Sequence, residues 1–469
     1  MRLACSIRRV STRPLQASTP RLSSSVAMAT PYRFSVSPTD TGLLKVKQDD
    51  AAATRVSELL QDDLETHHVF FNDEGFHNHI AHQLLTLYGT GSSAEALTKA
   101  YDQNKAYQLP ARKGDVSIAD SLSRDWEKEA PKYLGKGDNY ADFLLYFQRE
   151  IEKQGWLAVV ERHLFGDSPS CLDFLGRLCA GFYHPLIQLM YGIEWEQPAL
   201  VAEGLAQAAV HDARITELMR EVDEYISSSS GEVKLTDSLP DLLESLREKH
   251  PKLATSAHWE DPNRIFDGVL KRARPEAVAL LAGIQVRDGD LEERTAEMLH
   301  ASAYVVAAAA WNPPYVPKFD FFLLHNLTAA PFFLTLNKLP TIPTSSKARL
   351  LTWKTRMDVI GYLSRGLPPL RMDQDTLSVP NDVTHSRDLV PRFQNIVDDG
   401  HVIKVVRSLL LAEEASAPYG DKAWVRLRER RDWVRALNRL LVGSEGAKLD
   451  QIWVRSAGFP EAWKNLPKL

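Results

Sequence analysis

Apolar residues recur at three- and four-residue intervals along most of this chain, and this periodicity constrains the fold more than any other feature. The segment 75–88, for example, carries Phe76, Ile80 and Leu84 at helical spacing. Comparable patterns predict helices over residues 92–107, 139–165, 171–191, 198–219, 237–249, 275–284, 290–310, 320–336, 345–364, 387–415 and 422–442. Strand-like alternation is confined to residues 67–71 and 315–316. The sequence therefore predicts an all-α protein with a large multi-helix globular fold.

The first segment of the chain differs in composition from the rest. Residues 1–39 contain six arginines, many Ser and Thr, and no Asp, Glu or Lys. This composition is typical of a mitochondrial transit peptide, so we set residues 1–39 aside as a transit peptide or unstructured leader. We expect a mitochondrial location if residues 1–27 are translated, and a cytoplasmic one if translation starts at Met28.

A polar stretch divides the remaining chain. Residues 227–263 combine a serine run with a charged segment, which is typical of a linker. We therefore predict an N-terminal helical half over residues 40–226 and a C-terminal helical half over residues 264–469. Apolar residues are dense on both sides of the linker, so the two halves can share one core.

Charge and composition exclude several classes of protein. The net charge is −5, and because the leader is basic, the rest of the chain is more acidic still. An acidic body without a cluster of Lys and Arg argues against a nucleic-acid partner. The longest apolar run, residues 303–311, has nine residues, whereas a membrane-spanning helix needs about 20. Three cysteines are too few for a disulfide framework.

Standard catalytic motifs are also missing from the sequence. It contains no P-loop, no H-E-x-x-H and no G-x-S-x-G. Residues 89–94 have the G-x-G-x-x-A spacing, but they follow a predicted helix and not a strand. A Rossmann dinucleotide site is therefore not supported.

Histidines give the strongest functional signal. There are 14 in the chain, and several lie within apolar helical segments. His79 and His82 are three residues apart, so we expect them on one helix face, where two imidazoles can share a metal ion. His184 and His325 lie in strongly apolar surroundings, and His211 ends a polar stripe on an alanine-rich helix. A single buried histidine is more often a hydrogen-bonded core residue, so the argument depends on their number.

A lysine accompanies the last of these histidines. His401 and Lys404 are one turn apart, and Lys404 is flanked by valine and isoleucine. Burial lowers a lysine pKa, and a neutral amine can take up carbon dioxide to give a carbamate, which binds metals as a carboxylate does. The alternative is a surface lysine whose charged end reaches the solvent. Histidine ligands with one or two oxygens suit iron, copper, nickel or zinc, and the spacing does not choose among them.

Several stretches resemble the questin oxidase-like family. They are His67–Asn72 with Gly75–Tyr88, His184–Ile187 with Tyr191–Glu194, the helix ending at His211, Asp320–His325, Arg365–Pro368 and His401–Lys404. The resemblance covers residues from about 40 to 450. It implies an oxidoreductase of fungal aromatic polyketide pathways that uses dioxygen to insert oxygen into, or cleave, a ring of an anthraquinone-type substrate.

The resemblance also implies a site. Some relatives hold a mononuclear non-haem iron on histidines and a carboxylated lysine. On this chain the corresponding metal-ligand candidates are His79, His82, His184, His325 and Lys404. We expect His211 and His401 to orient ligands or move protons. The resemblance further allows a requirement for NADPH, although the sequence holds no fingerprint for binding it.

Two other functions are compatible with the sequence. The adjacent pair His211-Asp212 in a helical chain would suit a metal-dependent phosphohydrolase of the HD type. Alternatively, the chain is a non-catalytic helical binding protein that has kept the family fold. Bound metal and turnover would separate these readings.

Overall fold

The computed structural model describes residues 28–72, 74–166, 168–229, 233–372 and 377–469. Their regular structure is helical, and within these residues there is no β-sheet, which confirms the predicted all-α class. The two segments with strand-like alternation form only isolated bridges, among them His67 with Pro110 and Tyr315 with Lys468.

The helices follow one another through the whole described chain. The first ten α-helices are α1 (Asp50–Thr66), α2 (Ile80–Gly89), α3 (Ala94–Asn104), α4 (Val116–Arg124), α5 (Trp126–Glu129), α6 (Tyr140–Gln154), α7 (Trp156–Leu164), α8 (Pro169–Leu178), α9 (Ala180–Glu194) and α10 (Pro198–Val210). The others are α11 (Arg214–Ser228), α12 (Leu239–Lys249), α13 (Pro251–Ala254), α14 (Leu270–Arg272), α15 (Arg274–Ala282), α16 (Leu291–Ala309), α17 (Leu323–Ala329), α18 (Phe332–Leu336), α19 (Thr344–Ser364), α20 (Val390–Phe393), α21 (His401–Ser416) and α22 (Arg430–Ser444). Short 3-10 turns connect several of them.

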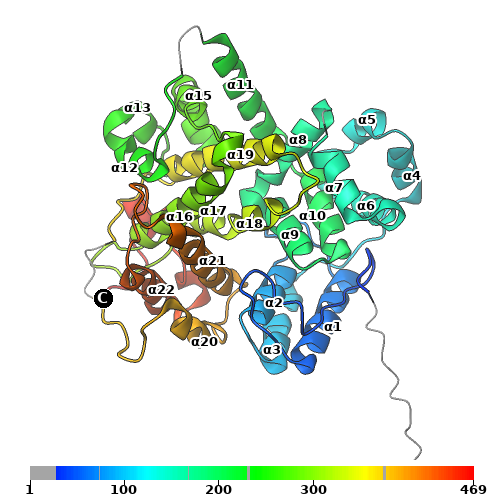
Figure 1. Ribbon diagram of the computed structural model, residues 1–469, viewed down its shortest axis with the longest axis horizontal. Helices are drawn as coiled ribbons and strands as arrows, with labels where there is room; N and C mark the ends of the chain where they lie inside the picture. The colour runs from blue at the N-terminus through cyan, green and yellow to red at the C-terminus, as the bar shows by residue number, and fades with distance from the viewer. Residues whose placement is uncertain (1–27, 73, 167, 230–232, 373–376) are drawn as a thin grey trace, which may run out of the picture.

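Four helices that are far apart in the sequence meet in the middle of the molecule (Figure 1). Helix α2 contacts α9 and α21, and α17 contacts the same two helices. The ring formed by α2, α9, α17 and α21 therefore brings residues from both predicted halves of the chain to one place.

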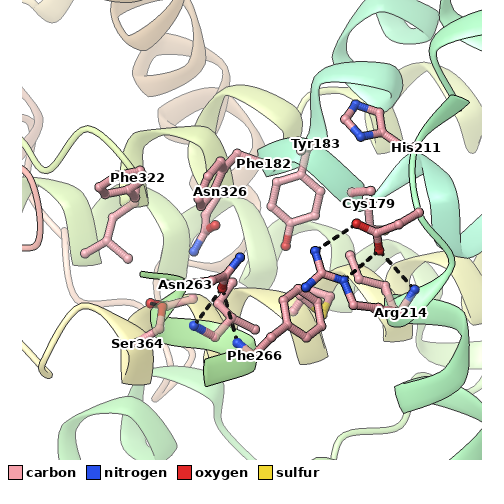
Figure 2. A pocket seen from close by; sticks show the side chains of 18 of the residues that line it. Cys179, Phe182, Tyr183, His211, Arg214, Asn263, Phe266, Phe322, Asn326 and Ser364 are labelled. Atoms are coloured by element: carbon pink, nitrogen blue, oxygen red, sulfur yellow. Dashed lines mark hydrogen bonds and ion pairs between the residues drawn. The ribbon is translucent and has the colours of Figure 1, made fainter. Parts of the chain in front are cut away.

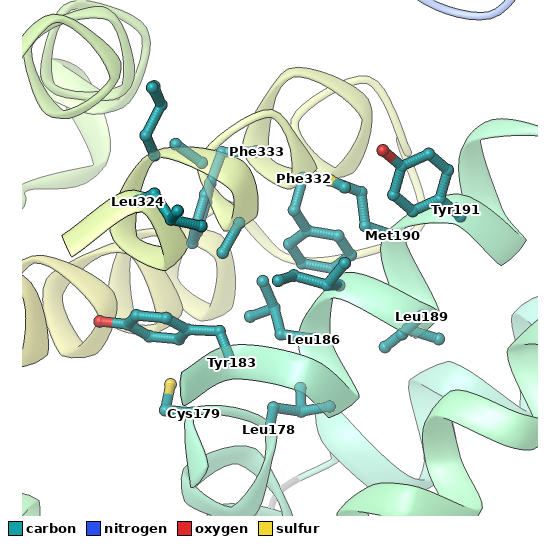
Figure 3. Packing of buried hydrophobic residues seen from close by; sticks show 14 of the residues in the cluster. Leu178, Cys179, Tyr183, Leu186, Leu189, Met190, Tyr191, Leu324, Phe332 and Phe333 are labelled. Carbon is teal, nitrogen blue, oxygen red and sulfur yellow. The ribbon is translucent and has the colours of Figure 1, made fainter. Parts of the chain in front are cut away.

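A single large hydrophobic core holds this arrangement together. Its buried side chains run from Phe34 to Trp453 and come from both sides of residues 227–263. Figure 3 shows a part of it, with Leu186 of α9, Leu324 of α17 and Phe332 of α18 among its side chains. The boundaries proposed for the two halves stay a prediction, and the core itself is continuous across them.

Part of the segment set aside as a leader packs against this core. Phe34 and Val36 are buried, and their backbone N–H groups donate to Gln61 Oε1 and Ser57 Oγ of α1. Residues 1–27, the remainder of the predicted leader, lie outside the described residues. In the described part of the chain, none of the helices has both the length and the apolar composition needed to cross a membrane.

The structure interrupts several predicted helices, and four of these interruptions lie next to histidines of the candidate site. The helix predicted over 75–88 starts only at Ile80, and the one predicted over 171–191 is split by a left-handed turn at residues 181–183. Gly400, with φ +87°, separates α21 from the segment before it. Helix α17 starts at Leu323 and ends before Pro331, where a break was expected because proline cannot donate the helical hydrogen bond. These interruptions position the site.

Candidate metal centre

The backbone before His184 is strained in an unusual way. Gly181, Phe182 and Tyr183 have φ values of 53°, 55° and 66°, so three consecutive residues are left-handed. A Cβ atom on Gly181 would lie 2.5 Å from the His211 ring, which leaves room only for glycine. Pro185 follows in the first right-handed turn, where its missing N–H is not needed. Such strain persists only where the surrounding structure enforces it, and it is concentrated at functional sites.

Four histidines lie at the N-terminal starts of the four central helices. His79 is the residue before α2, His184 opens the right-handed part of α9, His325 is in the first turn of α17, and His401 is the first residue of α21. The N-terminal end of a helix carries the positive end of its dipole, which disfavours a protonated imidazole. This placement therefore helps to keep all four rings neutral.

The Nε2 atoms of these four rings converge. His79 Nε2 lies 2.8 Å from His184 Nε2, and His325 Nε2 lies 3.1 Å from His401 Nε2. Ring nitrogens of His79, His184 and His401 all lie within 4.8 Å of one another. The rings of His184 and His325 have centroids 4.9 Å apart, which joins the two close pairs into one cluster.

Every Nδ1 atom of the cluster faces an oxygen atom. His184 Nδ1 is 2.5 Å from Gly181 O, and His325 Nδ1 is 2.7 Å from Phe321 O. The two carboxylate oxygens of Asp399 face the other two rings, at 3.3 Å from His79 Nδ1 and 2.6 Å from His401 Nδ1. Carbonyl and carboxylate oxygens only accept hydrogen bonds, so each neutral ring carries its proton on Nδ1.

The consequence is that the Nε2 atoms meet in two pairs, His79 with His184 and His325 with His401, with no proton between the two atoms of either pair. Lone pairs this close repel each other unless a cation lies between them. The same pattern, with Nε2 toward a metal and Nδ1–H toward an oxygen, holds histidine ligands in metalloproteins. The donor set therefore fits a metal ion, and nitrogen donors suit iron, copper, nickel or zinc.

Burial sets the protonation of these groups. It lowers the pKa of His79, holds those of His184 and His325 well below the usual range, and lowers that of His401 to about 3. Burial alone would raise the pKa of Asp399, but its interactions with His401 and His79 outweigh burial and hold that pKa well below the usual range. Neutral imidazoles beside an ionised carboxylate are the protonation states that metal binding requires.

Lys404 lies beside this cluster, one turn into α21. It is 1% exposed, and its Nζ atom has no hydrogen-bond partner among the described residues. Burial lowers its pKa to about 8, although Asp399 and Asp398 counteract this effect. Its charge acts on His79, His325 and His401, and lowers the pKa of each. Lys404 is therefore buried, as predicted, and the alternative of a surface lysine is wrong.

His82 has a different environment from the four converging rings. Its Nε2 bonds the Oε1 atom of Gln188, and Gln188 Nε2 donates to Glu203 Oε2 at 2.7 Å. Its Nδ1 has no partner within the described chain. His82 therefore lies next to the cluster, 5.9 Å from His79 between ring centroids, with its Nε2 bonded elsewhere.

His211 pairs with His77, a residue that the sequence patterns did not single out. Their Nε2 atoms are 2.9 Å apart, and the His77 ring stacks on His184 at 4.1 Å. The neighbouring Asp212 forms an ion pair with Arg214, which donates to both of its carboxylate oxygens. Among the described residues, His211 and Asp212 belong to no group with metal-binding spacing, which an HD-type phosphohydrolase would require.

A chamber of about 320 Å³ opens beside the cluster. His77, His79 and Asp399 line one side of it, so it reaches a histidine of the centre directly. Its other walls are mostly aromatic and apolar, formed by Phe76, Tyr107, Phe321, Ile452 and Trp453. Tyr191 and Trp311 are buried in the core and do not line it.

The sequence identified most members of the centre but not all. His79, His184 and His325 lie together, His401, which was predicted to orient ligands or move protons, lies with them, and His82 and Lys404 lie beside them. Asp399 was missed, although a carboxylate two residues before a histidine was a usable signal. His77 was missed because the helix was expected to begin before it.

Comparisons with known proteins give a matching family model and several relatives. Residues 76–409 match the family model described as questin oxidase-like. The chain is 35% identical to oxidoreductase AflY of Aspergillus parasiticus, with 94% of each chain covered. It is 32% identical to questin oxidase of Aspergillus fumigatus over 89% of this chain and 94% of the relative. It is 34% identical to Baeyer-Villiger monooxygenase AacuH of Aspergillus aculeatus over 88% of this chain and 90% of the relative.

Proposed function

The chain belongs to the questin oxidase-like family of oxidoreductases, and from this premise we propose that it oxidises a phenolic anthraquinone or a similar aromatic polyketide with dioxygen at a histidine-bound iron. The reaction is oxygen insertion of the Baeyer–Villiger type or ring cleavage. The convergence of four unprotonated Nε2 atoms carries this proposal, because it is a ready donor set for one cation.

The protein would hold the iron with His79, His184, His325 and His401. Iron bound there supplies the activation of dioxygen, which the side chains alone cannot provide. The Nδ1 contacts to Gly181 O, Phe321 O and Asp399 fix the orientation of all four rings. Asp399 has a second effect, because its negative charge makes the two imidazoles that it contacts better donors.

Lys404 would contribute negative charge to the same centre. A buried ammonium beside four metal-binding nitrogens would repel the metal, whereas the neutral amine can react with carbon dioxide. The lone pair of the lysine nitrogen attacks the carbon of carbon dioxide. The electron pair of one C–O π bond moves onto its oxygen, and the nitrogen releases one proton. The resulting carbamate places an anionic oxygen where the free amine has no partner.

The aromatic substrate would occupy the chamber beside His79. Its walls of Phe76, Phe321 and Trp453 fit flat rings and exclude water from the reacting carbon. The chamber volume of about 320 Å³ lies within the range found for small-molecule sites. His77 reaches the same chamber and is bonded to His211, so this pair can accept or return a proton at the edge of the substrate.

The two outcomes differ in their demand for electrons. Insertion of one oxygen atom, with the other released as water, consumes two electrons from a reductant such as NADPH. Ring cleavage that incorporates both atoms consumes none. Turnover with and without NADPH therefore separates the two reaction types, and no binding fingerprint in the sequence decides between them.

The test combines metal analysis with turnover. Protein expressed from Met28 with iron supplied and without chelators should contain about one equivalent of iron. It should consume dioxygen with a hydroxylated anthraquinone and give a product heavier by one or two oxygen atoms. His325→Ala should lose both the iron and the turnover, because it removes one donor and leaves His401 Nε2 without its counterpart.

His250 provides a matched control. It lies at the end of α12, is only partly buried, and belongs to neither His/Asp group with metal-binding spacing. His250→Ala should keep iron content and turnover. A well-folded wild-type preparation that takes up no metal would refute the proposal.

A further inference from the structure

A second cavity, of about 310 Å³, lies on the other side of the His77–His211 pair. His211 lines this cavity, whereas His77 lines the chamber described above. Figure 2 shows His211 at one end of the cavity and Phe322 at the other, with Phe182 and Phe266 among the walls between them. None of the four converging histidines lines it, so the proposed oxidation leaves this cavity without a role.

The cavity wall contains a buried cation that makes no direct ion pair. Arg365 lines the wall and is 3% exposed, yet no carboxylate of the described residues lies within ion-pair distance of it. Its guanidinium donates only to Ser364 Oγ and Ser456 Oγ, both of which are uncharged. Arg214, on the opposite wall, is different because both carboxylate oxygens of Asp212 neutralise it.

The segment after α19 is built to hold this arginine in place. Arg365 ends α19, and Gly366 and Leu367 follow with φ values of 78° and 48°. A Cβ atom on Gly458 would lie 2.3 Å from Gly366 O, so the two segments approach as closely as glycine permits. Arg365 O also accepts a hydrogen bond from Gly458 N. The Arg-Gly-Leu-Pro motif therefore fixes the backbone from which the guanidinium reaches the cavity wall.

The charge on Arg365 persists although the site is buried. Burial lowers the pKa of Arg365 to about 10, and Asp320 opposes this effect. Arg365 therefore stays protonated at neutral pH. Asp320 acts on Arg365 without a direct ion pair, and its carboxylate oxygens accept backbone N–H groups from Phe322, Leu323 and Ala457. A buried charge without a direct ion pair is costly to the fold, so a binding role explains it better than a structural one.

The remaining walls suit a flat ring with a polar edge. The Arg365 guanidinium lies 4.3 Å from the centre of the Phe322 ring, and Phe182 packs on Phe322 at 4.9 Å. The side-chain oxygen of Asn263 accepts hydrogen bonds from Ile265 N and Phe266 N, which leaves its amide nitrogen as a donor. Aromatic faces and two donors, with Arg365 as the charge that no direct ion pair neutralises, are the features of a site for an aromatic anion.

We infer that this second cavity binds an aromatic carboxylate, with its ring against Phe182 and Phe322 and its carboxylate on Arg365. This site is separate from the chamber that reaches His79, and it needs no metal.

The test uses 2-naphthoate and its neutral counterpart 2-naphthamide as probes, titrated into chelator-treated protein at pH 7 and followed by calorimetry. Wild type should bind naphthoate about 10- to 100-fold more tightly than naphthamide, the range expected for hydrogen bonds to a buried charge. Arg365→Met should remove that preference and leave naphthamide binding unchanged. Arg365→Lys should keep part of it, since the positive charge remains.

Arg455 is the matched control. It lines the other chamber and lies over the Phe321 ring at 4.2 Å, much as Arg365 lies over Phe322. Arg455→Met should bind naphthoate as wild type does. Equal binding of both probes by wild type, no binding at all, or loss of the preference in Arg455→Met alone would overturn the inference. The first two outcomes are measured on wild type alone, so they can overturn the inference even if the Arg365→Met variant does not fold. Because the protein is metal-free, failure of the iron proposal leaves these results unaffected.

Discussion

Two buried histidines of this protein have equal burial but different hydrogen-bond partners. His300 of α16 and His401 of α21 are both fully buried, and burial lowers the pKa of each to about 3. Both nitrogens of His300 have protein partners: Nδ1 contacts Ser416 Oγ at 3.0 Å, and Nε2 accepts from Arg426 N at 2.7 Å. His401 has such a partner only at Nδ1, and its Nε2 faces another imidazole.

The partner of the Nε2 lone pair therefore distinguishes a structural histidine from a candidate metal ligand. His300 acts as a hydrogen-bond bridge between α16 and the segment around Arg426 and Leu427. His401 contributes a lone pair to a group of lone pairs. The two regions should therefore respond differently to the same substitution.

The largest effect is expected for His300→Ala. The substitution leaves a cavity and removes the acceptor of the Arg426 and Leu427 N–H groups, so it should lower the free energy of unfolding by about 3–5 kcal/mol. Urea denaturation measures this loss, and iron content per folded molecule should stay unchanged. His300→Gln, whose amide oxygen can accept the same N–H groups, should recover part of the stability.

His325→Ala should behave in the opposite way, with loss of iron and a smaller loss of stability. It removes a ring whose Nε2 only faces His401 in the metal-free protein. If His300→Ala lost iron while His325→Ala retained it, lone-pair direction would be the wrong criterion.

The second experiment concerns the buried acid behind the centre. Burial, reinforced by Asp63, raises the pKa of Glu203 to about 8, so the folded protein keeps its proton where the unfolded chain has lost it. The stabilisation from this group is full below the unfolded pKa of about 4.5 and decreases as the pH rises to about 8. Between pH 5 and pH 7, wild type should lose about 2–3 kcal/mol relative to Glu203→Gln.

Urea denaturation at pH 5, 6 and 7 measures this difference. Glu203→Gln keeps an oxygen for the Gln188 amide, so it removes the titration without removing the hydrogen bond. Glu224→Gln, at an exposed position of α11, should follow wild type at every pH. Parallel curves for wild type and Glu203→Gln would show that Glu203 is ionised in the folded protein.

The sequence predicted the class of fold and the residue types of the centre for a clear physical reason. Helical periodicity is a local property, and histidines surrounded by apolar residues, such as His325, are visible in any single chain. Lys404 could be recognised as buried for the same reason, because valine and isoleucine flank it. These features do not depend on how distant segments meet.

The breaks in the helices could not be predicted in this way. The left-handed turn before His184 and the helix start at His401 are enforced by packing against other segments. Gly181 fits closely against His211, and a Cβ atom on Gly400 would lie 2.6 Å from Gln83 Cβ. Since these contacts join residues far apart in the sequence, periodicity extended the predicted helices through them. The breaks turn the four histidines toward one another. The tertiary contacts that the sequence pattern does not show are therefore the ones that form the site.

The smallest effect is expected at Asp399, and it tests the tautomers on which the comparison depends. The carboxylate of Asp399 accepts from two imidazoles, whereas an amide has one accepting oxygen and an NH₂ group that donates. In Asp399→Asn, either His79 or His401 must move its proton from Nδ1 to Nε2, which removes one lone pair from the cluster. Metal affinity should fall about 10- to 100-fold, as for other groups that orient metal ligands.

Competition with a chelator for ferrous iron measures that affinity, and the adjacent aspartate supplies the control. Asp398 accepts from Gly400 N and Val402 N at the start of α21, and its carboxylate lies within 4.8 Å of His401 without a hydrogen bond to a ring of the cluster. Asp398→Asn keeps one accepting oxygen, so it should cost less than the ~1 kcal/mol of a lost helix cap and leave metal affinity near that of wild type. Equal affinities for the two variants would mean that the lone pairs at Nε2 do not depend on Asp399. The distinction between His401 and His300 would then have to rest on something other than hydrogen-bond direction.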